Sequence, residues 1–289
     1  MTLSAGSPRE AEDILARIEA QAVRRDLASQ NGPVVWRVWG SGPPVLLLHG
    51  SHGAWSHWAR NIEALASWRT VVAPDIPGFG ESALPPNPDD ASSFGEELAR
   101  GLSAIVGSDA AVDIVGFSTG GLMGAHLAAL APDSVRRLIL VDPGGLGTEV
   151  GDYQSFAVRG LSGEALRQAH RGNLASMMLH EPAEIDELAL LIQSRNAPLT
   201  RAYARPLVLP DRLLEVLSRV RAPIDLIWGE HDALHPDGAR HQAIVQGIDP
   251  QCSLSIIPAA GHWVMFEAAE AFNATLRALL LDPPRRLRP

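Results

Sequence analysis

A strand-to-helix junction at one serine constrains this chain more than any other feature. Residues 113–121 read DIVGFSTGG, an apolar run typical of a buried strand that ends at Ser118 and continues as a helical pattern. A serine on such a sharp turn has a positive φ, and the flanking chain passes too close for a side chain larger than hydrogen. Gly116 and Gly120 provide that clearance. The spacing predicts a nucleophile elbow, although an ordinary tight turn in a glycine-rich chain would also fit these five residues alone.

Two backbone regions could stabilise negative charge beside Ser118. The helix predicted at residues 119–130 directs its positive N-terminal end at the serine, and its first amide N–H groups have no partner inside the helix. A second donor is the N–H of Ser51, in the glycine-bracketed loop HGSHG that follows the apolar strand predicted at residues 45–48. The alternative for this loop is a simple strand-to-helix connection.

Strand and helix patterns alternate over most of the chain, which is typical of a parallel sheet covered by helices on both faces. An Asn-Gly pair at residues 31–32 predicts a hairpin and an antiparallel edge near the N-terminus. Strands are predicted at residues 34–38, 45–48, 70–73, 113–117, 137–142, 224–228 and 253–257. Helices are predicted at about residues 8–23, 58–67, 92–105, 119–130, 238–245 and 265–281.

The alternation stops after residue 146, where helical patterns follow one another without a strand, at residues 164–179, 184–194 and 211–219. This pattern predicts a helical cap inserted over the carboxyl-terminal edge of the sheet. The predicted fold class is therefore α/β, with a mostly parallel central sheet, helices on both faces and an inserted helical cap. The expected division is a first part of the core with an N-terminal helix at residues 1–145, the cap at 146–222 and the second part of the core at 223–289.

Charge and cysteine content exclude several classes of partner. The net charge of −9 is spread without long runs of one sign, so no basic stripe is available for nucleic acid or an anionic membrane. The single cysteine, Cys252, cannot form an internal disulfide or a cysteine metal cluster. No signal-peptide core and no run of 18 apolar residues occur, so we expect a cytoplasmic protein with a small-molecule substrate. A homo-oligomer is compatible with this composition.

Two more polar residues follow predicted strand ends. Asp232 lies in the loop GEHDALHP and His262 in the loop PAAGHW, each directly after an apolar strand. Because the carboxyl ends of parallel strands meet at one edge of a sheet, Ser118, Asp232 and His262 are expected to come together. Asp142 also follows a buried strand and is the alternative acid, although Asp232 is preferred.

These motifs make the chain resemble the α/β-hydrolase superfamily along nearly its whole length. The resemblance is carried, in the superfamily's order, by His49-Gly50, DIPGFGES at residues 75–82, the elbow, WGEHD at 228–232 and GHW at 261–263. It implies a catalytic triad of Ser118, Asp232 and His262, with the histidine as general base. The implied oxyanion hole consists of the backbone N–H groups of Thr119 and Ser51. The resemblance implies no metal and no organic cofactor.

The remaining histidines have structural alternatives. His49 is expected to buttress the oxyanion loop, whereas a metal cluster would require the loops that carry His52, His57, His231 and His235 to converge. A serine at position 118 also disfavours dehalogenase and epoxide-hydrolase chemistry, because that chemistry needs a carboxylate nucleophile in this superfamily.

Two substrate classes stay open within the resemblance. The segment Gly261-His262-Trp263 is similar to that of the hydrolases that cleave carbon–carbon bonds in ring-fission products of aromatic catabolism. Those enzymes usually carry a polar asparagine before the nucleophile, where this chain has Phe117. The first choice is therefore a carboxylic ester hydrolase, and the second is a carbon–carbon bond hydrolase. A catalytically silent fold that binds a ligand is a third alternative, which the complete set of triad residues disfavours.

Several residues are candidates for the substrate pocket. Met177 and Met178 could present adaptable apolar surface, although packing between helices is the alternative. Phe117 and Trp263 are further candidates, next to the nucleophile and the base in the chain. A dienol acid would also need a cationic anchor. The cap arginines that could supply it are Arg195, which is placed first, Arg201 and Arg205.

Overall fold

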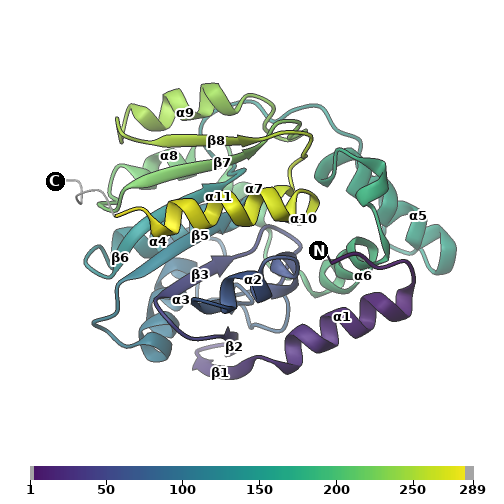
Figure 1. Cartoon of the computed structure of the whole chain (residues 1–289), viewed down its shortest axis with the longest axis horizontal. Helices are drawn as coiled ribbons and strands as arrows, with labels where there is room; N and C mark the ends of the chain where they lie inside the picture. Colours follow the sequence, from purple (N-terminus) through teal and green to yellow (C-terminus); the bar gives the residue numbers. More distant parts are fainter. Residues whose placement is uncertain (1–2, 284–289) are drawn as a thin grey trace.

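Residues 3–283, which the computed structural model describes, form an eight-stranded sheet in the order β1-β2-β4-β3-β5-β6-β7-β8 (Figure 1). The pairs β1–β2 and β2–β4 are antiparallel, and the other neighbours are parallel. Ser29 pairs with Gly32 across the predicted Asn-Gly hairpin. The strands are β1 (Val23–Ser29), β2 (Gly32–Trp39), β3 (Pro44–Leu48), β4 (Thr70–Pro74), β5 (Val112–Phe117), β6 (Val135–Val141), β7 (Ile224–Gly229) and β8 (Ser253–Ile257).

Helices cover both faces of this sheet. Every residue of β5 and β7 is buried, as expected for continuous apolar runs in the middle of a parallel sheet. One apolar core packs against α2 (Ile62–Ala66) and α11 (Ala269–Leu281). The core on the other face packs against α3 (Ala91–Val106), α4 (Thr119–Leu130), α8 (Arg212–Leu217) and α9 (Gly238–Gln246). The α/β fold with a mostly parallel sheet, predicted from the sequence, is confirmed.

Several predicted helices are interrupted. The helix predicted at residues 58–67 is a 3₁₀ turn, η1 (Trp55–Trp58), followed by the short α2. The last helix is divided into α10 (Val264–Glu267) and α11, because Ala268 leaves the helical region with φ −110° and ψ 48°. The first cap helix changes from α5 (Gly163–Asn173) to a π-helical turn, η2 (Leu174–Met178). No helix within residues 3–283 combines the length and the apolar character needed to span a bilayer.

Part of the chain that follows β6, including Met177 of η2 and most of residues 200–209, lines a cavity with Ser118 at the carboxyl end of β5. Figure 1 shows α5 and α6 (Glu187–Asn196) beyond this end of the sheet, with α1 (Pro8–Ala20) beside α6. We call α5, η2 and α6 the cap helices. The shorter elements of this region are η3 (Pro182–Glu184), η4 (Ala197–Leu199) and α7 (Ala204–Val208). In contrast, α8 packs on α4 and so joins the helical layer of the sheet, although its sequence position suggests the cap.

The buried side chain of Arg60 connects the cap helices to the sheet domain through hydrogen bonds. The side chain of Arg60 is 1% exposed and lies 3.8 Å above the ring of Phe266. It donates to the carboxylates of Glu184 (2.7 Å) and Asp186 (2.9 Å) and to the carbonyl of Phe266 (2.8 Å). Asp186 is also the N-cap of α6, where it accepts the N–H of Ala189. Arg60 therefore joins the start of α6 to the segment that follows the predicted catalytic histidine.

Removal of this arginine should destabilise the protein strongly. In Arg60→Met, the carboxylates of Glu184 and Asp186 lose a buried partner, and we expect the free energy of unfolding to fall by about 3 kcal/mol. The matched control is Arg195→Met. Arg195 forms an ion pair that holds α6 too, but its partner is Glu12 of the N-terminal helix and both side chains are exposed. Its loss should cost less than about 1 kcal/mol. Urea unfolding of both variants measures the difference, and equal losses would contradict the assigned role of Arg60.

Candidate active site

Ser118 occupies a strained turn between β5 and α4. Its backbone has φ 52° and ψ −119°, in the left-handed range that non-glycine residues rarely adopt. A Cβ atom on Gly116 would lie 2.5 Å from the carbonyl oxygen of Gly120, and one on Gly120 would lie 2.4 Å from that of Leu48. Both glycines are therefore required by the close passage of neighbouring main chain, and the elbow has the geometry that its sequence predicts.

His262 and Asp232 form a buried hydrogen-bonded pair. His262 follows β8 and Asp232 follows β7, and His262 Nδ1 lies 2.9 Å from Asp232 Oδ2. The other carboxylate oxygen, Oδ1, accepts the backbone N–H groups of Leu234 (2.8 Å) and His235 (3.1 Å). Burial alone raises the pKa of Asp232, but the neighbouring His262 outweighs burial, and the pKa lies below its ordinary value. An ionised carboxylate only accepts hydrogen bonds, so Nδ1 carries the proton and Nε2 is left as a proton acceptor.

Phe117 brings the imidazole and the elbow together. The ring centroids of Phe117 and His262 are 5.0 Å apart, and Phe117 directly precedes Ser118. On the other side, a Cβ atom on Gly50 would lie 2.9 Å from the Phe117 ring and 3.2 Å from Ser118 Cβ. The predicted nucleophile, the predicted base and the loop after β3 are thus in close contact around this phenylalanine.

The two residues whose backbone N–H groups are the predicted oxyanion donors lie side by side. The hydroxyl groups of Ser51 and Thr119 are 2.6 Å apart, and both residues line the same cavity as Ser118. Thr119 is the first residue of α4, whose early N–H groups have no partner inside the helix. His49 supports this loop from behind. Its Nε2 accepts the N–H of Ile76 (2.9 Å), so its Nδ1 donates to the carbonyl of Gly50 (2.8 Å). Burial lowers the pKa of His49, which keeps the ring neutral.

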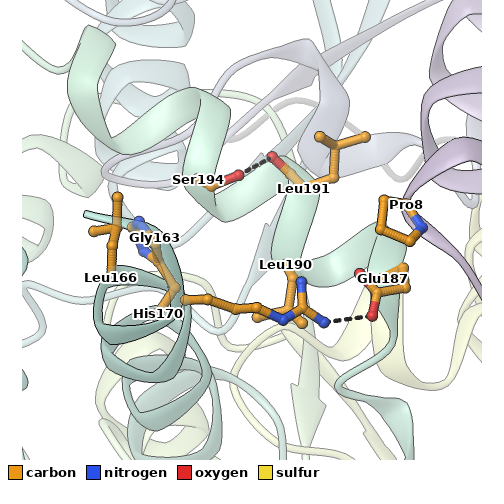
Figure 2. A pocket seen from close by; sticks show the side chains of 9 residues that line it. Pro8, Gly163, Leu166, His170, Glu187, Leu190, Leu191 and Ser194 are labelled. Atoms are coloured by element: carbon orange, nitrogen blue, oxygen red, sulfur yellow. Dashed lines mark hydrogen bonds and ion pairs between the residues drawn. The ribbon is translucent and has the colours of Figure 1, made fainter. Parts of the chain in front are cut away.

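A cavity of about 650 Å³ lies between these residues and the helical region. The sheet domain contributes Ser51, Ser118 and Thr119 to its wall, and the inserted region contributes Met177 and Arg205, among others. Figure 2 shows a different cavity, of about 210 Å³, between α5 and α6 near Pro8. Its wall contains the ion pair of Arg167 with Glu187 and none of the residues predicted for the site. The larger cavity is therefore the candidate substrate pocket.

The structure corrects the placement of several predicted pocket residues. Phe117 and Trp263 are 1% and 0% exposed, so they support the site from inside the core. Of the two methionines, Met177 lines the cavity, whereas Met178 packs against the core. Arg195 lies on an exposed part of α6 and pairs with Glu12, because the outward face of the helix carries it away from the cavity.

Some other cavity residues, such as Tyr153, were not identified from the sequence in this role. Tyr153 lines the cavity but belongs to residues 147–162, where no helix or strand forms and no periodic pattern marks a position. Arg201 and Arg205, two of the three cap arginines considered as cationic anchors, also line it. Arg201 is held by the carbonyls of Gly80 and Ser82. Arg205 is largely exposed, so its guanidinium remains accessible to a ligand.

The residues considered for metal binding do not converge. Within residues 3–283, Asp142, Asp232 and His262 are the only group of three or more acidic, histidine or cysteine side chains whose potential ligand atoms all lie within 4.8 Å of one another. In this group the bond between His262 and Asp232 already uses two of the ligand atoms. The arrangement fits a hydrogen-bonded proton-transfer site better than a cation site. The four histidines discussed above, His52, His57, His231 and His235, form no such group in the described part of the chain.

Comparison with known proteins places these features in context. A model described as the alpha/beta hydrolase family matches residues 45–275. The dihydrolipoyllysine-residue acetyltransferase component of the acetoin cleaving system from Pseudomonas putida is 30% identical over 83% of this chain. The matched region covers 64% of the length of that protein. The 2-hydroxy-6-oxo-6-phenylhexa-2,4-dienoate hydrolase from Burkholderia cepacia is 27% identical over 81% of this chain and 86% of that protein. The esterase RhEst1 from Rhodococcus sp. ECU1013 has a TM-score of 0.74 at 22% identity, over 90% of this chain and 99% of that structure, which is a likeness of fold.

Buried histidines surround the candidate site in neutral form. Burial lowers the pKa of His57 well below its ordinary value, and the neighbouring His49 and His52 lower it further. Burial also lowers the pKa of His235, to about 4. A histidine whose pKa is lower in the folded than in the unfolded protein takes up a proton first in the unfolded state. Such a residue makes the protein less stable in acid.

The stability of the protein should therefore fall as the pH decreases. The contribution of neutral His235 to the free energy of unfolding is complete above about pH 6.5, the ordinary pKa of histidine. This contribution is lost as the pH falls toward about 4, the pKa of His235 in the folded protein. We expect His235→Gln to reduce the difference in unfolding free energy between pH 7 and pH 5, measured by urea denaturation. His231→Gln, at an exposed histidine, is the control and should leave that difference unchanged. An undiminished pH dependence in His235→Gln would show that this histidine is not buried in neutral form.

Proposed function

The chain belongs to the alpha/beta hydrolase family, and from this premise we propose that it is a serine hydrolase that cleaves a small carboxylic ester through an acyl-enzyme. The observation that carries the proposal is the buried 2.9 Å hydrogen bond between His262 and Asp232, next to a serine held at φ 52°. A hydroxyl is a weak nucleophile until a base takes its proton. The hydrogen bond orients such a base and stabilises its charged form.

The proposed reaction has two similar halves. Ser118 Oγ bonds to the ester carbonyl carbon while its proton passes to His262 Nε2, and the histidine then gives that proton to the departing alcohol. A water molecule repeats both steps on the acyl-enzyme and releases the carboxylic acid. The N–H groups of Thr119 and Ser51 are assigned to the developing oxyanion, where one donor contributes about 3 kcal/mol. These steps need only the chain's own residues.

The cavity supports a small ester as the substrate. Its volume of about 650 Å³ falls in the range of small-molecule sites. Apolar side chains of Met177, Val208 and Leu209 form part of the wall and offer a surface for an acyl or alcohol group. An ester needs an oxyanion hole and such an apolar slot, and it needs no polar side chain at position 117, where Phe117 is buried.

Arg205 favours a second candidate function. A product of aromatic ring fission is a dienol acid, and its carboxylate requires a cationic partner in the pocket. Arg205 lines the cavity with an exposed guanidinium. The relative from Burkholderia cepacia is named as a hydrolase of such an acid. Carbon–carbon bond cleavage of a dienol acid is therefore the second proposal, ranked below ester hydrolysis because of Phe117.

The first test concerns the nucleophile. A fluorophosphonate probe should label Ser118, and Ser118→Ala should lower kcat toward p-nitrophenyl esters by at least about 10³-fold while folding normally. Ser103→Ala, an exposed serine on α3, is the control and should keep both labelling and turnover. Labelling of another residue would refute the assignment. A folded protein without labelling or turnover would point to the catalytically silent alternative.

The second test separates the two substrate classes. We expect kcat/KM to be higher for short or medium acyl esters than for dienol acids. Arg205→Gln should change kcat/KM for a neutral ester by less than about threefold, but should lower it at least about tenfold for any anionic substrate that is cleaved. Arg195→Gln is the control, because Arg195 pairs with Glu12 at an exposed site and does not line the cavity, so its loss should affect neither substrate. Faster cleavage of dienol acids, abolished in Arg205→Gln, would promote the second proposal.

A further inference from the structure

A second aspartate lies behind the His262–Asp232 pair. Asp142 follows β6, the strand next to β7 in the sheet, and its side chain is completely buried. One of its carboxylate oxygens lies within 4.8 Å of both an Asp232 oxygen and a His262 ring nitrogen. Its backbone has φ 43°, a conformation that costs energy in a non-glycine residue and that clusters at functional sites. The turn thus aims a buried acid at the predicted catalytic acid.

The two carboxyl groups are bonded very differently. Asp232 accepts three N–H donors, from His262, Leu234 and His235. Asp142 accepts one, from the backbone of Gly229 to Oδ1 at 2.9 Å. Its second oxygen, Oδ2, is buried and has no hydrogen-bond partner among residues 3–283. The unequal donor count stabilises negative charge on Asp232 and leaves one oxygen of Asp142 available to carry a proton.

The surroundings supply no cation that would allow both acids to ionise. Within residues 3–283, Asp232 forms its ion pair with His262, and no ion pair joins Asp142 or Asp232 to an arginine. The other titratable groups that act on this pair are His235 and His241, and burial lowers the pKa of both. Two neighbouring carboxylates in a buried site strongly disfavour ionisation of both. Consistently, burial and the charge of Asp232 raise the pKa of Asp142 well above its ordinary value.

We propose that Asp142 is a positioning residue, held as a neutral carboxylic acid whose O–H is directed at the Asp232 carboxylate. The proposal rests on the triad of the proposed function and extends it to four residues. The O–H of Asp142 holds the Asp232 carboxylate in the plane that faces His262 and withdraws part of its negative charge. Asp142 would thereby set both the orientation and the proton affinity of the base without touching the substrate.

Infrared spectroscopy tests the protonation state directly. At neutral pH, the wild-type protein should show a carboxylic-acid C=O stretch that disappears in Asp142→Asn. Asparagine tolerates the positive φ of this turn, so this variant should fold. Glu267→Gln is the control, because burial raises the pKa of that carboxyl too, and it should leave the Asp142 band in place. A wild-type spectrum that does not differ from that of Asp142→Asn in this region would overturn the proposal.

The pH profile of kcat/KM tests the effect on the base. The amide of Asp142→Asn is neutral and still donates to Asp232, so its acid limb should coincide with that of the wild type. In Asp142→Gly, which suits φ 43° and removes the donor, Asp232 regains its full charge and favours protonation of His262. The acid limb should then move to higher pH by about one unit, and kcat should fall at least about tenfold.

Opposite results have distinct meanings. An acid limb that moves to lower pH in Asp142→Asn would show that Asp142 is charged in the wild type, and would overturn the proposal. An unmoved limb in Asp142→Gly, with stability alone reduced, would reduce Asp142 to a packing role. If Asp142→Gly does not fold, the infrared band and the Asp142→Asn profile still decide. The band does not depend on turnover, so a failure of Ser118 to react would refute the proposed function without affecting this measurement.

Discussion

The close approach of three main-chain segments around Ser118 is the constraint on which the rest of the site depends. The elbow passes so near to the end of β3 and to the start of α4 that Gly116 and Gly120 admit no Cβ atom. This contact sets the serine against the loop that contains Ser51 and points the N-terminal end of α4 at the same space. Because the strain at φ 52° is held by a fully buried strand, the turn cannot relax without disturbing the sheet.

Burial determines the electrostatics of the region behind the elbow. Phe117 and Trp263 pack against His57, and burial keeps His49, His57 and His235 neutral, whereas Asp232 beside His262 stays ionised. In such surroundings a single hydrogen-bonded carboxylate influences an imidazole far more than it would in water. The same low polarity explains why a neighbouring acid is expected to keep its proton.

The loop that carries His262 is also tied to the inserted region. The N–H of Trp263 donates to the carbonyl of Met178 (2.7 Å), and the buried carboxylate of Glu267 accepts the N–H groups of Gly261 and Glu181 (both 2.6 Å). Together with Arg60, these bonds join the end of η2 and the start of α6 to the histidine loop. The predicted base and the wall of the cavity are therefore parts of one hydrogen-bonded assembly.

The sequence alone determined the sheet, the elbow and the order of Ser118, Asp232 and His262, because strand runs, glycine clearance and strand-end polar residues are local patterns with a direct steric cause. Tertiary structure decided what depends on packing between distant segments. It decided that Asp232 bonds to His262 while Asp142 lies behind it, that Arg195 faces Glu12, and that Arg205 reaches the cavity. It also divided helices that the hydrophobic pattern runs together. A sequence pattern fixes which face of an element is buried, but the partner that a side chain meets is fixed only when the elements pack.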